Sequence, residues 1–118
     1  MAIERFEDLR VWQVAQDYAV LIYRLTKLFP EDERFGVTIQ IRRCVYSISA
    51  NIAEGFGRRT KKDKSHFYTM AYGSLLETKN FLYLCERLGY AKQHVIEPLL
   101  DDGVALQKQI NALISSLT

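Results

Sequence analysis

Apolar residues recur at steps of three and four along most of this 118-residue chain. That spacing places them on one side of an α-helix, whereas a half-buried strand would show strict alternation of apolar and polar residues. The pattern predicts four amphipathic helices over about residues 8–29, 33–56, 61–88 and 92–117. Each helix has one apolar face to bury, so the four faces predict a shared core.

Polar and conformationally restricted residues indicate where the first two helices begin and end. Asp8 is of a residue type that caps helix N-termini, and Pro30 ends the first helix because proline has no N–H group. The acidic turn Glu31–Glu33 suits the positive end of a helix dipole. We therefore expect the first helix to begin at Asp8 and the second near Glu33.

The third helix has clear signals at both ends. Thr60 followed by Asp63 resembles a capping box with aspartate in the place of the usual glutamate or glutamine, and Gly89 is a typical residue just beyond a helix. Pro98 either lies in the first turn of the last helix or kinks it, and the sequence leaves both open.

The four predicted helices leave little chain for any other element. No Val/Ile/Thr-rich run alternates between turn signals as a strand would. Short connections make consecutive helices antiparallel neighbours. The prediction is an all-α protein with one domain over residues 1–118, an antiparallel up-down-up-down four-helix bundle.

Composition excludes several protein classes. Hydrophobic residues make up 48% of the chain and charged residues 25%, a mixture typical of a globular protein. No segment approaches the roughly 20 apolar residues that a membrane span requires, and the first residues do not resemble a signal peptide. We expect a cytoplasmic protein without membrane contact. Cys44 and Cys85 lack metal-binding spacing, which indicates small core residues.

Positive charge is concentrated between the second and third helices. The net charge is +2, but residues 42–64 alone carry seven basic and two acidic side chains. A basic turn at the start of a helix can contact phosphates, since the helix N-terminus adds to the positive field. An ordinary solvated turn is the alternative. The candidate nucleic-acid-binding residues are Arg58, Arg59, Lys61, Lys62 and Lys64.

A polar stripe flanks the apolar face of the second helix at the same helical spacing, and Glu77 on the third helix is grouped with it. Such residues can form defined hydrogen bonds across a subunit interface. The candidate interface residues are Arg43, Ser47, Asn51, Glu54 and Glu77. A weaker alternative is acid–base or metal chemistry, or a small-molecule site, involving Glu54 and Glu77.

The rest of a catalytic or metal site is missing from the sequence. Metal centres in helical bundles use Glu-x-x-His motifs, but neither His66 nor His94 has a glutamate three residues before it. We therefore expect no catalytic residues, no metal and no cofactor. Seven large aromatics are either half-buried interface groups or the edge of the core: Trp12, Tyr18, Tyr23, Phe56, Tyr68, Tyr72 and Tyr83.

Residues 40–55 read Gln-Ile-Arg-Arg-Cys-Val-Tyr-Ser-Ile-Ser-Ala-Asn-Ile-Ala-Glu-Gly, a run far too specific for generic helix patterning. Further matching segments are Phe6–Trp12, Phe29–Glu33, Gly55–Arg58, Gly73–Glu77 and Leu88–Tyr90. Together they resemble the four-helix bundle family known as the S23 or 23S rRNA-intervening sequence protein family. The resemblance spans nearly the whole chain.

The resemblance implies a left-handed twist of the bundle, a closed homopentameric ring and no assigned catalytic activity. Some relatives are encoded inside spacers of large-subunit rRNA genes. The family is distantly similar to the accessory variability determinant protein of diversity-generating retroelements, a more basic pentamer that binds nucleic acid and a reverse transcriptase. We expect a homo-oligomeric scaffold that contacts RNA or DNA; the alternative is a structural module that binds only another protein.

Overall fold

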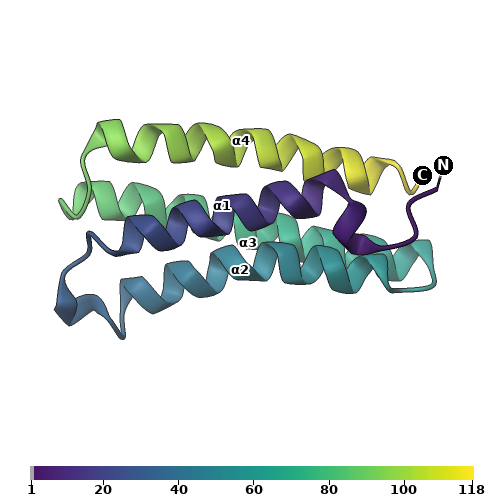
Figure 1. The fold of residues 1–118 in the computed structure, drawn as a ribbon, viewed down its shortest axis with the longest axis horizontal. Coiled ribbons are helices and arrows are strands. Elements are labelled where there is room, and N and C mark those ends of the chain that lie inside the picture. Colours follow the sequence, from purple (N-terminus) through teal and green to yellow (C-terminus); the bar gives the residue numbers. More distant parts are fainter. Residues whose placement is uncertain (1) are drawn as a thin grey trace.

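The computed structural model describes residues 2–118, and within that range it contains helices and no strand. The four long helices are α1 (Arg10–Thr26), α2 (Val37–Phe56), α3 (Lys61–Arg87) and α4 (Gln93–Ser115). Two short 3-10 helices, η1 (Phe6–Asp8) and η2 (Glu31–Glu33), precede α1 and α2. Consecutive long helices run in opposite directions (Figure 1). The predicted all-α four-helix bundle is confirmed, and the left-handed twist stays a prediction.

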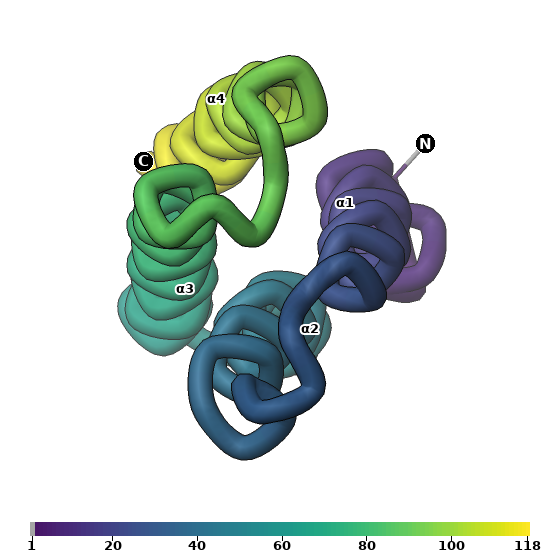
Figure 2. The backbone as a smooth tube through the Cα atoms, turned by 90° about the vertical axis from the view of Figure 1, so that its left-hand side faces the viewer, coloured from purple at the N-terminus to yellow at the C-terminus, as the bar shows by residue number. Residues whose placement is uncertain are grey.

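The helices surround one core in the order of the chain, as the end-on view shows (Figure 2). Each helix packs against the helices before and after it, and α1 also packs against α4. The contact between α2 and α3 is the most extensive, and that between α1 and α4 is the least. The result is a rod measuring 45 × 25 × 19 Å. Its α2–α3 turn lies at the same end as both chain ends (Figure 1).

Aliphatic side chains from all four helices fill the core. Its largest fully buried members include Ile22, Ile48, Leu75, Leu82 and Leu106. Burying side chains of this kind contributes roughly 1.5–3 kcal/mol each relative to leaving them in water, before conformational entropy is subtracted. The shared core that the apolar periodicity predicted is therefore present.

Some residues that the three- and four-residue spacing places on the apolar faces lie outside the core, among them Phe67, Leu88 and Val104. Phe67 is only partly buried, and Leu88 and Val104 are exposed. The neighbouring Tyr68 is buried instead of Phe67, and Gly103 is buried beside Val104. Two residues one position apart differ by about 100° around a helix, so sequence spacing alone does not decide which edge of a broad apolar stripe faces inward.

The start of α1 corrects the sequence prediction. Asp8 lies in the 3-10 helix η1 and does not cap α1; the N-cap residue is Leu9, whose side chain makes no capping bond. Leu9 has an extended backbone, so the chain turns into α1 only after it. The helix ends at Thr26, before the predicted Phe29, because Lys27, Leu28 and Phe29 close tighter 3-10-type hydrogen bonds ahead of Pro30.

The start of α2 also lies later than predicted. The acidic turn forms η2 by itself, and α2 begins at Val37 because the backbone of Gly36 is far from helical. The carboxylate of Glu33 nevertheless serves this helix, since its Oε1 accepts a hydrogen bond from the Val37 N–H at 3.3 Å. The Tyr90 hydroxyl donates to the other oxygen of the same carboxylate.

Both predicted end signals of α3 are confirmed. The Thr60 hydroxyl accepts the Asp63 N–H at 3.1 Å, as an N-cap residue should. Beyond the last turn, Gly89 has a φ of 78°, while the N–H of Tyr90 reaches the carbonyl of Cys85 and that of Gly89 reaches Glu86. These two bonds form a Schellman motif, which satisfies carbonyls that the helix itself leaves open.

The last helix continues through its proline. Pro98 is the sixth residue of α4, beyond the first turn, and the helix extends from Gln93 to Ser115. A first-turn position, one of the two possibilities that the sequence leaves open, is therefore excluded. Since proline has no N–H group, it cannot donate the usual helical hydrogen bond to the carbonyl four residues earlier, that of His94.

At its C-terminal end, α2 makes a close approach to α3. A methyl group in place of a hydrogen on Gly55 would lie 2.7 Å from Cε1 of Tyr68 and 2.9 Å from Cβ of Phe67. Such contacts are too short for carbon atoms, so a larger residue would force the helices apart.

No helix among residues 2–118 is long and apolar enough to cross a membrane.

Gly73 inside α3 and Gly89 just beyond its end allow a paired test of stability. We expect Gly89→Ala to lower the free energy of unfolding by about 1–2 kcal/mol, since an L-residue is strained at that positive φ. Gly73→Ala, inside α3, should raise it by about 0.5–1 kcal/mol. An added Cβ meets no atom within 4 Å at either position. Urea unfolding measures both, and shifts of equal sign would contradict this explanation.

Candidate nucleic-acid interface

The basic segment forms the short turn between α2 and α3, at one end of the rod. Gly57 is the C-cap residue of α2 and Thr60 is the N-cap residue of α3, so little chain separates the two helices. The first N–H groups of a helix have no acceptor within it, and they give the N-terminus a partial positive charge. The turn therefore combines side-chain cations with the positive end of α3.

Arg58 is held against the bundle. Its guanidinium carbon lies 4.3 Å from the centre of the Phe67 ring, and its Nη2 lies 3.9 Å from Oε2 of Glu54. Both charged side chains are about half exposed or more, at 48% and 62%, so the ion pair contributes little to stability. The contact with the Phe67 ring instead fixes the direction of the Arg58 guanidinium.

Lys64 is also engaged within the chain. Its Nζ donates a 2.6 Å hydrogen bond to the carbonyl of Phe56 and lies 5.2 Å from the centre of the Phe56 ring. Phe56 is the last residue of α2, so this cation neutralises the negative end of that helix dipole. Lys64 thus ties the end of α2 to the first turn of α3.

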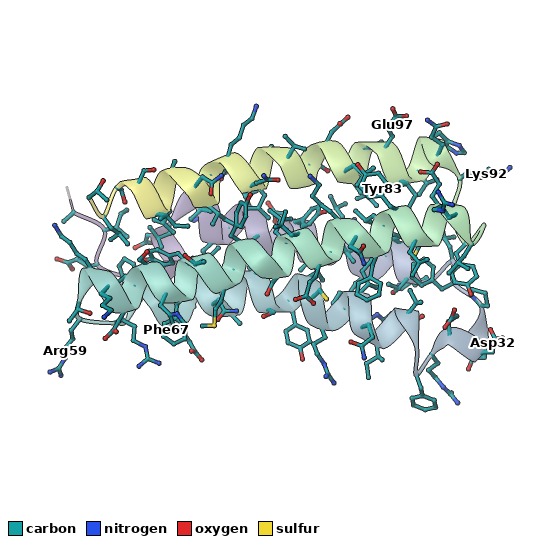
Figure 3. The ribbon with its side chains drawn as sticks, turned by 180° about the vertical axis from the view of Figure 1, so that it is seen from behind. Asp32, Arg59, Phe67, Tyr83, Lys92 and Glu97 are labelled. Carbon is teal, nitrogen blue, oxygen red and sulfur yellow. The ribbon has the colours of Figure 1, made fainter. Side chains whose placement is uncertain are left out.

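The remaining three candidates point into solvent. Arg59, Lys61 and Lys62 are exposed, and Figure 3 shows the Arg59 side chain extending from the end of the bundle. The structure therefore divides the five predicted cations into two with partners inside the chain and three that face outward. The sequence run itself does not distinguish the two groups.

The polar stripe lies along the seam between α2 and α3. The Asn51 amide donates to the carbonyl of Ser47 at 2.9 Å and to its hydroxyl at 3.0 Å, and the Ser74 hydroxyl donates to the Ser47 hydroxyl at 3.1 Å. The Ser74 bond links α3 to α2, whereas the two Asn51 bonds lie within α2; all three residues are partly buried. Ser74 was not among the predicted residues, although it lies in a segment that carries the family resemblance.

The structure does not join Glu54 and Glu77 into one group. Glu54 pairs with Arg58, whereas Oε2 of Glu77 accepts a hydrogen bond from the Cys44 thiol at 3.4 Å. Arg43 is exposed on α2. Among residues 2–118, no three His, Cys, Asp or Glu side chains gather in a cluster that would hold a metal ion.

The Cys44 thiol has an unusual environment that the sequence did not indicate. Burial, followed by the hydrogen bond to the Glu77 carboxylate, raises the pKa of this thiol to about 11. Cys85 is fully buried, and burial together with the nearby Glu33 carboxylate raises its pKa to about 11 as well. Both thiols are protonated at neutral pH and are therefore weak nucleophiles.

The chain matches known proteins in family and in fold. A family model described as 23S rRNA-intervening sequence protein matches residues 7–112. The crystal structure of a protein of unknown function from the S23 ribosomal protein family of Bacteroides thetaiotaomicron has a TM-score of 0.81 and 28% sequence identity. The match covers 88% of this chain and 97% of that one. No curated protein matches the chain.

The thiol environment predicts the outcome of alkylation. We expect Glu77→Gln to lower the pKa of Cys44 and to speed its reaction with iodoacetamide several-fold near pH 8, because the carboxylate no longer stabilises the neutral thiol. Peptide mass spectrometry measures labelling of each cysteine separately. Cys85 is the internal control and should label slowly in both proteins; faster labelling of both cysteines would indicate partial unfolding instead.

Proposed function

This chain belongs to the 23S rRNA-intervening sequence protein family, and from that premise we propose a non-enzymatic, homo-oligomeric scaffold whose basic turn binds RNA or DNA. The observation that carries the proposal is the group of three exposed cations, Arg59, Lys61 and Lys62, at the N-terminus of α3. Lysine and arginine side chains bind nucleic acids mainly by neutralising phosphates. The rRNA in the family description agrees with such a partner and with a cytoplasmic site of action.

The two inward-held cations support the same surface. Arg58 and Lys64 fix the ends of α2 and α3 relative to each other through Phe67 and the carbonyl of Phe56. The outward-facing cations are therefore attached to a turn with little freedom, so less conformational entropy is lost when they contact a polyanion. Phosphate contacts of this kind give salt-dependent binding with little sequence preference.

Oligomerisation multiplies a weak contact. In the five-subunit ring that the family resemblance implies, each turn would recur five times, and simultaneous contacts with one nucleic-acid strand would raise the overall affinity without any new contact. The polar stripe of Arg43, Ser47, Asn51, Glu54 and Glu77 stays a candidate for the subunit contact, although several of its groups already bond within the chain.

The absence of catalysis is part of the proposal. Acid–base work by two carboxylates requires that both reach the same reacting group. Glu54 and Glu77 instead have separate partners, Arg58 and Cys44.

Exposed aromatics favour a second candidate, a scaffold that binds only protein. Tyr46 and Tyr83 expose 51% and 54% of their surface. Tyrosine is enriched in protein interfaces because it combines a large apolar ring with a hydroxyl group. Such a partner would show little of the salt dependence that phosphate contacts produce.

Removal of the exposed cations tests nucleic-acid binding. We expect the triple variant Arg59→Ala, Lys61→Ala, Lys62→Ala to reduce the slope of log affinity against log salt concentration by about 2–3. Each phosphate contact contributes about 0.9 to the magnitude of this slope for duplex DNA and about 0.7 for single strands. At low salt the affinity should fall by more than tenfold. Fluorescence anisotropy with short single- and double-stranded RNA and DNA measures both quantities.

The control removes the same charge elsewhere. In the variant Arg34→Ala, Lys92→Ala, Lys108→Ala three exposed cations outside the turn are lost, and Lys92 lies at the opposite end of the bundle from Arg59 (Figure 3). Nearly unchanged affinity is expected for it. An equal loss in both triple variants would assign binding to net charge alone, and no binding by the unaltered chain at low salt would refute the nucleic-acid proposal.

A further inference from the structure

The outer seam between α1 and α2 is an apolar groove with a basic edge. Val20 and Tyr23 of α1 and Tyr46 of α2 line a hollow of about 500 Å³, and all three are among the exposed large hydrophobic residues. Arg24 and Lys27 also line this hollow and make its edge basic. Exposed tyrosine and valine side chains along one groove favour a partner that covers them.

The outer seam between α3 and α4 is a second groove, with the opposite character. Its volume is about 680 Å³, and its lining includes the exposed apolar side chains of Tyr83 and Val104. Three carboxylates, Glu86, Glu97 and Asp101, also line it, together with two basic residues. Figure 3 shows Tyr83 on α3 and Glu97 on the neighbouring α4. This groove is therefore apolar with an acidic excess.

The two grooves lie on opposite sides of the rod. Seen end-on, the α1–α2 seam and the α3–α4 seam face away from each other (Figure 2). One chain therefore cannot cover its own grooves, but a second copy presents the complementary surface. We propose that copies of this chain dock head to tail, with the α1–α2 groove of one copy against the α3–α4 groove of the next. This inference rests on the proposed homo-oligomer.

Charge decides between head-to-tail contact and contact between identical faces. Two α1–α2 grooves placed together would oppose Arg24 and Lys27 to their own copies, whereas the α3–α4 groove offers Glu97 and Asp101 to them. The tyrosines on both sides supply rigid contact area with few rotatable bonds. Because every contact leaves one groove of each kind uncovered, assembly continues until a ring closes.

A mixing experiment tests the arrangement. One variant, Arg24→Glu with Lys27→Glu, makes the α1–α2 groove acidic; the other, Tyr83→Asp with Val104→Asp, places acids in the apolar part of the α3–α4 groove. All four side chains are exposed, so each variant should fold. Each variant alone should be monomeric by native mass spectrometry. An equimolar mixture should form a one-to-one dimer and stop there, because the two intact grooves dock to each other and both grooves left free in the pair carry the substitutions.

The outcomes separate this inference from the proposed function. A monomeric unaltered chain would refute the homo-oligomer and the docking together. An unaltered oligomer whose variants keep its size, or whose monomeric variants form no dimer on mixing, would overturn head-to-tail docking alone. The matched control is Arg59→Glu with Lys61→Glu, which reverses two charges in the basic turn and should leave assembly unchanged.

Nucleic acid is the other class of occupant for the α1–α2 groove, since bases stack on tyrosine and cations attract phosphate. The acidic partner groove on the opposite side of the same chain favours a second copy. If Arg24→Glu with Lys27→Glu abolishes binding of single-stranded RNA while the oligomer keeps its size, the groove binds nucleic acid and the docking inference is wrong.

Discussion

At the C-terminal end of α2, Gly55 lies so close to α3 that one added methyl group would be 2.7 Å from the Tyr68 ring. This close approach allows the hydroxyls of Ser47 and Ser74 to bond across the helix pair and the Cys44 thiol to reach Glu77. Small polar side chains can link helices only at short separation. The α2–α3 pair is therefore the most extensively packed pair of the bundle, and the basic turn joins its two helices.

Local signals were sufficient where a feature depends on a few consecutive residues. The Thr60 cap and the Gly89 stop were predicted correctly because each acts through backbone groups within one turn. Asp8 was assigned wrongly as a cap because the chain forms a 3-10 turn there first. The late start of α2 depends on the backbone of Gly36, which the acidic residues before it did not reveal.

The sequence identified the residues of the candidate site but did not predict the contacts that each of them makes. The sequence showed five cations near one turn, but it did not show that Arg58 and Lys64 have aromatic and carbonyl partners inside the chain. It grouped Glu77 with Glu54 because the two carboxylates lie on neighbouring helices, whereas the partner of Glu77 is Cys44. Such pairings join residues on different helices, so they depend on the relative rotation and height of the helices, which periodicity leaves undetermined.

In the α2–α3 turn, the residues that hold its shape differ from those that are exposed on its surface. Its shape depends on the Thr60 cap, the ring beneath Arg58 and the carbonyl bonded to Lys64. Positions 59, 61 and 62 are exposed and carry none of those roles. Mutation at these three positions can therefore change how strongly the surface attracts anions while the bundle remains intact. Single substitutions there can change the surface charge in small steps, a form of evolvability that comes from placing substitutable residues on a fixed support.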